Sequence, residues 1–191
     1  MPVDQQITIR TARLLLRDVR EGDDQRLFPL FANWEVIRWL SSPPWPYRRE
    51  DMRRYAQQPA EPAGEPETRF VITRDAVPIG LIGARMRGAS EIQRHPGPNI
   101  GYWLGQPYWG NGYMSEVVRG VAAHIFSERA HDAIYAGVFV GNDASLRVQE
   151  KLGFVRDGET MLFSNPHQKA LPHINTVLAR AAFRRATAHC A

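Results

Sequence analysis

Three glycines separate a strand-like stretch from a helix-like stretch in the segment GYWLGQPYWGNGYMSEVV, which begins at Gly101. They are Gly105, Gly110 and Gly112. A glycine-rich turn that opens a helix leaves main-chain N–H groups free, and the helix dipole adds positive potential, so this arrangement binds phosphate groups. Glycine also permits positive φ and lets the main chain approach an anion closely. A plain strand-to-helix turn favours glycine as well, so the spacing alone leaves both interpretations open.

Two familiar phosphate motifs are excluded by the residues around these glycines. Gly105 and Gly110 have the spacing of a P-loop, but Asn111 stands in the lysine position and Gly112 in the Ser/Thr position. The dinucleotide-binding pattern fails too, because Ser115 stands where a third glycine is needed. The sequence therefore predicts neither a P-loop NTPase nor a Rossmann site.

Predicted strands and helices alternate along the chain, and together they would position this loop. Period-two or continuous apolar patterns predict strands, and an apolar face at helical spacing, as from Met114 to Ile125, predicts helices. We expect one α/β (α+β) domain over residues 7–183, with flexible termini at 1–6 and 184–191. The expected strands are 7–20, 68–74, 77–88, 99–105, 133–140, 154–164 and 174–182, and the expected helices are 20–40, 49–58, the one that begins near Met114, and 142–154.

Several motifs, in order, resemble the GNAT superfamily of acyl-CoA-dependent N-acyltransferases. YWGNGYMSEVV (108–118) is similar to its pyrophosphate-binding segment, and TARLLLR (11–17) to the opening strand of the branch that acetylates ribosomal-protein N-termini. NDASLRVQEKLGF (142–154) matches a third motif of that branch, and NTVLAR (175–180) matches its last strand more loosely. One departure is Pro107, which stands where the superfamily places Arg or Gln.

The resemblance implies a central mixed, mostly antiparallel sheet of about seven strands, flanked by about four helices and split at one splayed parallel pair. Acetyl-CoA would lie in that split, with its pantetheine arm hydrogen-bonded to one strand and its pyrophosphate held by main-chain amides. Asn142 and Ser145 would approach the pantetheine and the thioester sulfur, and Ser145 would protonate the leaving thiolate. The strand residues are Tyr102, Trp103 and Leu104, and the pyrophosphate residues are Trp109, Gly110, Asn111, Gly112, Tyr113 and Met114.

Asn142 and Ser145, at the start of the predicted helix 142–154, can also be read as purely structural residues. Asn142 is a suitable helix N-cap, and Ser145 can be a solvent-facing or second capping residue in the first helical turn.

The transfer reaction needs a neutral amine, and a general base would supply it. Glu116 is the first candidate, one turn into the helix after the phosphate loop, and His95, Glu67 and His131 are the others. An α-amino group, with a pKa of about 7.7–8.0, is appreciably neutral at pH 7, whereas a lysine at about 10.4 is not. Such an acceptor would need little help from a base.

The acceptor groove is expected from the first two helices and the loop between them. Trp34, Trp39 and Trp45 would line it, although tryptophans at such spacing are often core residues. The favoured acceptor is the α-amino group of a protein or peptide, as in ribosomal-protein acetylation. A small-molecule amine such as an antibiotic or polyamine, or a CoA-binding module without turnover, stays open as an alternative.

The composition is that of an ordinary soluble domain of 191 residues, 43% hydrophobic and 23% charged. The net charge of +4 comes without a dense basic run, so we expect no nucleic-acid partner. One cysteine, Cys190, excludes a disulfide framework, and no metal site is expected. Neither a signal peptide nor a membrane span is expected, so the cytoplasm is the expected compartment. A homodimer is left open.

Overall fold

The computed structural model describes residues 7–57, 67–127 and 131–188. Cys190, the first six residues and the loop expected at 59–66 lie outside the described residues. No helix within the described ranges is both long and apolar enough to span a bilayer.

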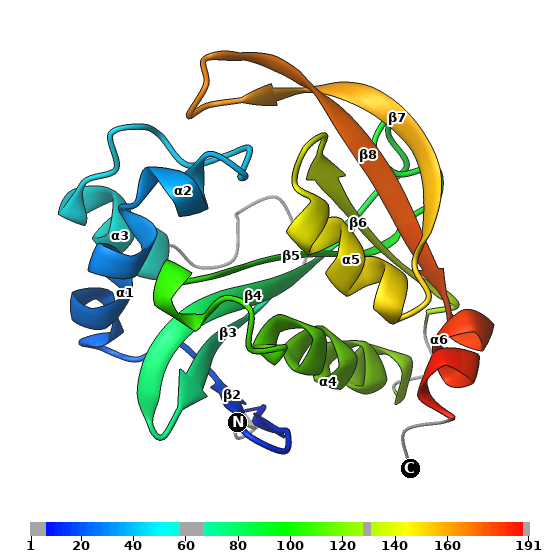
Figure 1. Cartoon of the computed structure of the whole chain (residues 1–191), viewed down its shortest axis with the longest axis horizontal. Coiled ribbons are helices and arrows are strands. Elements are labelled where there is room, and N and C mark those ends of the chain that lie inside the picture. The colour runs from blue at the N-terminus through cyan, green and yellow to red at the C-terminus, as the bar shows by residue number, and fades with distance from the viewer. Residues whose placement is uncertain (1–6, 58–66, 128–130, 189–191) are drawn as a thin grey trace, which may run out of the picture.

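One eight-stranded sheet forms the centre of the molecule (Figure 1). Neighbouring strands are antiparallel except for β5 and β6, which are parallel and in register only at Asn99 and Tyr135. The expectation of a mostly antiparallel sheet with one splayed parallel pair is confirmed. In spatial order the strands are β1 (Ile9–Arg10), β2 (Leu15–Arg17), β3 (Glu67–Arg74), β4 (Val77–Arg87), β5 (Gly97–Leu104), β6 (Ala133–Phe139), β8 (Lys169–Ala179) and β7 (Val155–Ser164).

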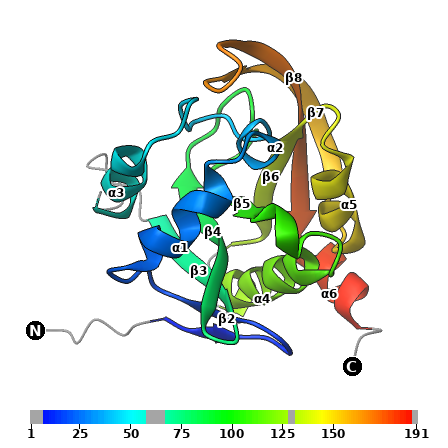
Figure 2. The same ribbon diagram turned by 60° about the vertical axis from the view of Figure 1, so that its left-hand side comes forward.

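Helices cover the two faces of this sheet differently (Figure 2). On one face the amphipathic helix α4 packs in the main core, with Ile100 of β5 and Ile134 of β6. On the other face α1, α2 and α3 enclose a second core with Val71 and Leu81. The helices are α1 (Asp23–Phe31), α2 (Trp34–Ile37), α3 (Arg49–Gln57), α4 (Tyr113–Ser127), α5 (Asp143–Lys151) and α6 (Arg180–Thr187).

Three expected elements differ in the structure. The first strand, predicted as 7–20, is a hairpin of β1 and β2, because Thr11 N–H donates to the Leu14 carbonyl at 3.0 Å and closes a turn. The helix predicted at 20–40 is two helices, because Asn33 is extended and its side chain caps α2 at the Glu35 N–H. The last strand ends at Ala179 rather than 182, and residues 180–187 form α6.

A buried ion pair fixes the start of α1, which has no side-chain cap of its own. Arg17 donates two hydrogen bonds to the Asp23 carboxylate at 2.7 and 2.8 Å, and Arg20 N–H donates a third at 2.8 Å. The hydrogen bond with Asp23 raises the pKa of Arg17, although its burial acts in the opposite direction. The last arginine of TARLLLR therefore ties the β1–β2 hairpin to the first helix.

Candidate functional site

The glycine loop between β5 and α4 has the geometry of an anion cradle. Gly110 and Gly112 have φ of 76° and 75°, a conformation that side chains with a Cβ disfavour. A Cβ at Gly110 would meet nothing within 4 Å, so this part of the loop faces open space. The N–H groups of residues 110–115 make no hydrogen bond to another described residue, whereas Trp109 N–H already donates to the Gln106 carbonyl at 3.1 Å. The free donors thus begin one residue later than the sequence predicts.

Side chains brace this loop from within. Asn111 Nδ2 donates to the carbonyls of Tyr108 and Trp109 at 3.2 and 2.9 Å, so its role is to hold the loop. The Trp109 indole N–H donates to the Leu104 carbonyl at 2.8 Å. Pro107 lies in a short 3₁₀ helix, Gln106–Tyr108, near its start, where a missing N–H removes no helical bond. The departure from the superfamily pattern is therefore accommodated without disturbing the glycines.

Glu116 is an anchor for the N-terminal hairpin. Its Oε1 accepts from Thr11 Oγ1 at 2.5 Å and from Arg13 N–H at 2.8 Å, and its Oε2 accepts from Arg13 Nε at 2.8 Å. Burial alone would raise the pKa of Glu116, but these hydrogen bonds outweigh it, and the pKa lies below its ordinary value. A carboxylate held ionised by three donors is a weak proton acceptor. The geometry thus favours a structural role over the catalytic one expected from the sequence.

The substitution Glu116→Gln is therefore expected to lower stability while leaving turnover within about threefold of wild type. The amide keeps one acceptor for Thr11 but loses the ion pair with Arg13, at a cost of about 1–2 kcal/mol. Thermal unfolding and steady-state kinetics on the purified variant measure the two effects separately. If turnover instead fell by about 10²-fold or more, the size typical of a lost general base, Glu116 would be restored as the base.

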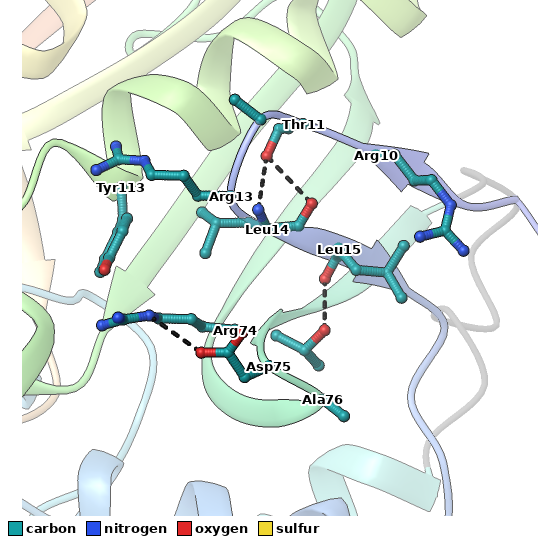
Figure 3. Close-up of a pocket in the computed structure, with 11 residues that line it drawn as sticks. Arg10, Thr11, Arg13, Leu14, Leu15, Arg74, Asp75, Ala76 and Tyr113 are labelled. Atoms are coloured by element: carbon teal, nitrogen blue, oxygen red, sulfur yellow. Dashed lines mark hydrogen bonds and ion pairs between the residues drawn. The ribbon is translucent and has the colours of Figure 1, made fainter.

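Two arginines flank Tyr113 beside the glycine loop (Figure 3). The guanidinium groups of Arg13 and Arg74 lie over its ring, at 4.6 and 5.5 Å from the centroid. Arg13 also donates to the Asn111 carbonyl at 3.1 Å. A cavity of about 560 Å³ opens here between the β1–β2 and β3–β4 hairpins. Both guanidinium groups are paired with carboxylates, Arg13 with Glu116 at 2.8 Å and Arg74 with Asp75 at 3.5 Å, so they add little net charge beside the free amides of the loop.

The opening between β5 and β6 exposes main-chain groups of β5. Gly105 N–H donates to the Ile79 carbonyl at 2.9 Å, and β5 pairs with β4 without a register shift. Because paired groups alternate in an antiparallel ladder, Trp103 also bonds to β4, while Tyr102 and Leu104 direct their N–H and carbonyl groups toward β6. Of the three strand residues named from the sequence, Tyr102 and Leu104 therefore face the opening, and the Leu104 carbonyl there already accepts from the Trp109 indole N–H at 2.8 Å.

Ser145, in the first turn of α5, lies at this opening and takes part in a hydrogen-bonded chain. Its Oγ donates to the Tyr102 hydroxyl at 2.9 Å. Gln149 Nε2 donates to the same hydroxyl at 3.2 Å, and Gln149 Oε1 accepts from Thr176 at 2.8 Å. Burial raises the pKa of Tyr102, although its hydrogen bonds with Ser145 and Gln149 oppose this, so the phenol stays protonated at neutral pH. The sequence did not reveal this chain, because its members come from β5, α5 and β8.

Asn142 caps α5 as predicted. Its Oδ1 accepts from Ser145 N–H at 3.2 Å, and its Nδ2 donates to no described residue. One group of the side chain is thus used for the cap, and the other is available to a ligand.

The three tryptophans gather at one end of the sheet. Trp34 packs against Trp45 and His167, with ring centroids 5.2 and 5.0 Å apart. Trp39 approaches the end of β6, since a Cβ at Gly141 would lie 3.6 Å from its ring. The segment 34–47 therefore reaches the residue just before Asn142.

Hydrogen bonds join this aromatic segment to the β7–β8 turn. Asn165 N–H donates to the Ser41 carbonyl at 2.8 Å, and Asn165 Nδ2 donates to the Ser42 carbonyl at 2.7 Å. The His167 ring also bonds to the Arg38 carbonyl at 3.1 Å. We call residues 34–47 the aromatic wall, and it closes one end of the β5–β6 opening.

The remaining candidate bases lie away from Ser145 in the topology. His95 is exposed in the loop between β4 and β5, and His131 lies just before β6, at the paired end of the parallel strands. Glu67 begins β3, and its side chain is outside the described part of the chain. The structure brings neither histidine to the opening.

Comparison with known proteins identifies the family. The sequence model of the acetyltransferase (GNAT) domain matches residues 13–155. The chain belongs to the GNAT acetyltransferase family. A relative from Bacillus subtilis strain 168, the uncharacterized N-acetyltransferase YoaA, is 30% identical over 181 residues, which cover 88% of this chain and 93% of YoaA.

Solved structures share the fold of this GNAT enzyme. Mycobacterium smegmatis RimJ, a Rim-type protein solved with CoA-disulfide, has a TM-score of 0.75 at 19% identity and covers 97% of this chain and 96% of its own. The aminoglycoside acetyltransferase AAC(6')-Ib, solved with ribostamycin and coenzyme A, has a TM-score of 0.74 at 23% identity, with coverage of 91% and 97%. The prediction of an acetyl-CoA-dependent N-acetyltransferase of GNAT type is confirmed.

Proposed function

We propose that this GNAT enzyme acetylates the α-amino group at the N-terminus of a peptide or protein. The observation that carries the proposal is the aromatic wall, which meets the end of β6 beside the Ser145 end of α5. Aromatic side chains supply rigid, largely apolar contact surface for a peptide. The guanidinium group of Arg38 lies over Trp39, at 4.7 Å from the indole centroid.

Residues at the glycine loop, on β5 and on α5 hold acetyl-CoA in this proposal. The free amides after Gly110 bind the pyrophosphate, and Tyr102 and Leu104 pair with the pantetheine arm. Ser145 donates its hydroxyl proton to the sulfur as the thiolate leaves, and the Tyr102 hydroxyl then turns to donate to Ser145. A proton delivered at this point stabilises charge that develops only in the transition state.

A small-molecule polyamine or aminoglycoside is the second candidate, since AAC(6')-Ib shares the fold and was solved with such compounds. These acceptors carry several positive charges and are best matched by unpaired carboxylates. On the wall, Glu35 lies within 3.3 Å of Arg38 and is thereby neutralised. The charge of the wall thus favours an acceptor with a single amine.

A competition between two peptides tests the proposal. A lysine-free peptide with a free N-terminus is expected to be acetylated faster from pH 7 to 8 than its N-blocked partner carrying one lysine. The physical reason is the lower pKa of the α-amino group, which leaves far more of it neutral. Faster acetylation of the blocked peptide overturns the proposal, and turnover of kanamycin or spermidine alone favours the second candidate.

The variant Trp39→Ala tests the wall in the same assay. We expect it to raise the KM of the peptide about tenfold, because one large buried contact is lost, and to leave the KM of acetyl-CoA unchanged. An unchanged peptide KM would remove the wall from the acceptor site.

A further inference from the structure

A histidine that the sequence analysis did not select borders the β5–β6 opening. His173 lies on β8, in register with Phe139 near the end of β6, and the two rings meet edge to face at 5.5 Å. The side chain is almost buried, with 8% of the residue exposed.

The ring lies on the face of the sheet opposite α4 and α5. Alternate residues of a strand share a face, and so do cross-strand partners. Ala136 of β6 packs in the core with α4, so Phe139, three positions later, lies on the other face with its cross-strand partner His173. On β5, Trp103 packs with the α1–α3 core on that same face. Ser145 and His173 therefore approach the opening from opposite faces.

Gly137 provides the space for the imidazole. A Cβ at Gly137 would lie 2.2 Å from His173 Cε1 and 2.7 Å from His173 Nε2, so no other residue fits there without moving the ring. Gly101 of β5 and Gly137 of β6 each lie two residues beyond the Asn99–Tyr135 pair, where the two strands are no longer paired. A Cβ at Gly101 would meet nothing within 4 Å. The imidazole thus occupies the space that Gly137 leaves, and Gly101 adds no side chain on the β5 side of the opening.

The neighbours of His173 determine which nitrogen carries the proton. Asn175 Nδ2 donates to the Glu91 carbonyl at 3.3 Å, which turns Asn175 Oδ1 toward the ring. His173 Nδ1 lies 2.8 Å from that oxygen and must donate to it, so Nε2 keeps a lone pair. Nε2 bonds to no described residue. Among the described residues the only fully buried polar side-chain atom without a partner is Ser164 Oγ, so Nε2 reaches accessible space.

The protonation state suits a proton acceptor. Burial lowers the pKa of His173, and the hydrogen bond with Asn175 offsets part of that effect. The imidazole is therefore neutral at pH 7.

We propose that His173 Nε2 accepts the proton that the acceptor amine loses as it attacks the thioester, with Asn175 and Gly137 positioning the ring. The amine nitrogen forms the C–N bond, the C–S bond breaks, and the sulfur leaves with the electron pair. The amine proton goes to His173 and then to solvent, while Ser145 gives its proton to the thiolate and regains one from solvent through the Tyr102 hydroxyl. The proposal rests on the amine-acetylating activity of the family and holds for a peptide or an aminoglycoside acceptor.

Kinetics of His173 variants give the first test. With a lysine-free peptide and kanamycin assayed in parallel, His173→Gln is expected to lower turnover roughly 10²-fold and to leave CoA affinity, measured by calorimetry, within about twofold. Free imidazole is expected to restore part of the activity of His173→Ala, which a purely structural residue would not allow. The matched control, His124→Gln on α4, should turn over like the wild type. A folded His173→Gln enzyme with turnover within about threefold of wild type overturns the proposal.

Gly137→Ala gives a second test, because its methyl group would displace the ring. The methyl group would also lie 2.8 Å from the Ile174 carbonyl oxygen, so thermal unfolding must show that the variant stays folded. We expect turnover to fall about as far as in His173→Gln, while Gly88→Ala, where a Cβ meets nothing within 4 Å, has no effect. Full turnover in Gly137→Ala would contradict the assigned position of the ring.

An NMR titration of the free enzyme needs no acceptor. The imidazole ¹⁵N shifts are expected to show His173 as the neutral Nδ1–H tautomer at pH 7, with a pKa below the ordinary value of about 6.5. Asn175→Asp is expected to raise that pKa by about one unit or more, because a carboxylate favours the cation. An Nε2–H tautomer or a cation at pH 7 overturns the proposal whatever the acceptor. The titratable and charged groups on the surrounding elements include Tyr135 on β6, three residues of β7 (Arg156, Asp157 and Glu159), Lys169 on β8, and Glu91, Arg94 and His95 in the loop before β5. Arg94 and Asp157 pair at 3.3 Å.

Discussion

Gly112→Val is expected to weaken CoA binding by about 10³-fold in a protein that stays folded. Gly112 has φ of 75°, which a β-branched residue adopts only with strain, so the loop would turn its N–H groups away from the pyrophosphate. Loss of two charge-assisted hydrogen bonds, at about 1.5–3 kcal/mol each, accounts for that change in affinity. The fold should survive, because a Cβ at Gly112 meets only Arg13 Nη2, at 3.7 Å.

Calorimetric titration with CoA measures the effect, and Gly88→Val is the matched control because it lies outside the loop. Asn111→Ala should cost less, about tenfold, because its side chain braces the loop and does not supply the free amides. Wild-type CoA affinity in a folded Gly112→Val protein would remove the pyrophosphate from this loop.

Ser145→Ala is expected to lower turnover by about 10²-fold or more, with little change in the KM of acetyl-CoA. The hydroxyl acts on the leaving sulfur in the transition state, so its loss changes turnover rather than binding. The capping bond from Ser145 N–H to Asn142 is donated by the main chain and remains in the variant. The helix therefore stays in place, and the kinetic effect reports the hydroxyl alone.

Steady-state kinetics of two further variants separate the possible roles of Ser145. Ser127→Ala, which removes a serine hydroxyl bonded to the His124 carbonyl at the end of α4, should be kinetically silent. Tyr102→Phe should lower turnover less than Ser145→Ala does, since Ser145 can still reach the sulfur. If Ser145→Ala keeps full turnover, the serine is only a helix residue, and the thiolate leaves unassisted.

Local patterns in the sequence were sufficient to predict the elements that we propose bind acetyl-CoA. The predicted helix at 142–154 is α5 with Asn142 as its cap, and the predicted glycine turn has the two positive φ angles that glycine permits. Each of these features depends on residues within a few positions of one another. The hairpin at 9–17 and the last helix were missed, because a two-residue strand and an uncapped short helix leave little periodic signal.

The acid–base residues were harder to predict because tertiary contacts decide their roles. Glu116 follows the phosphate loop directly, yet Thr11, 105 positions earlier in the chain, holds its carboxylate. His173 lies on β8, and the feature that distinguishes its environment is Gly137 on the neighbouring strand β6, which leaves room for the imidazole. One local signal was present: His173 and Asn175 are two apart, and a strand places such residues on the same face.

The hydrogen bonds between the aromatic wall and the β7–β8 turn determine the order in which parts of the site can assemble during synthesis. Ser42 and Asn165 are 123 positions apart, so the wall forms these bonds only after residue 165 has been made, later than its core contacts with Val71 and Leu81 become possible. The glycine loop, Tyr102 and Ser145 all precede Asn165 in synthesis, whereas His173 follows it. The half of the site that we propose receives the amine is therefore the last to be assembled, and a chain cut short after α5 contains the proposed CoA-binding residues without the proposed acceptor side.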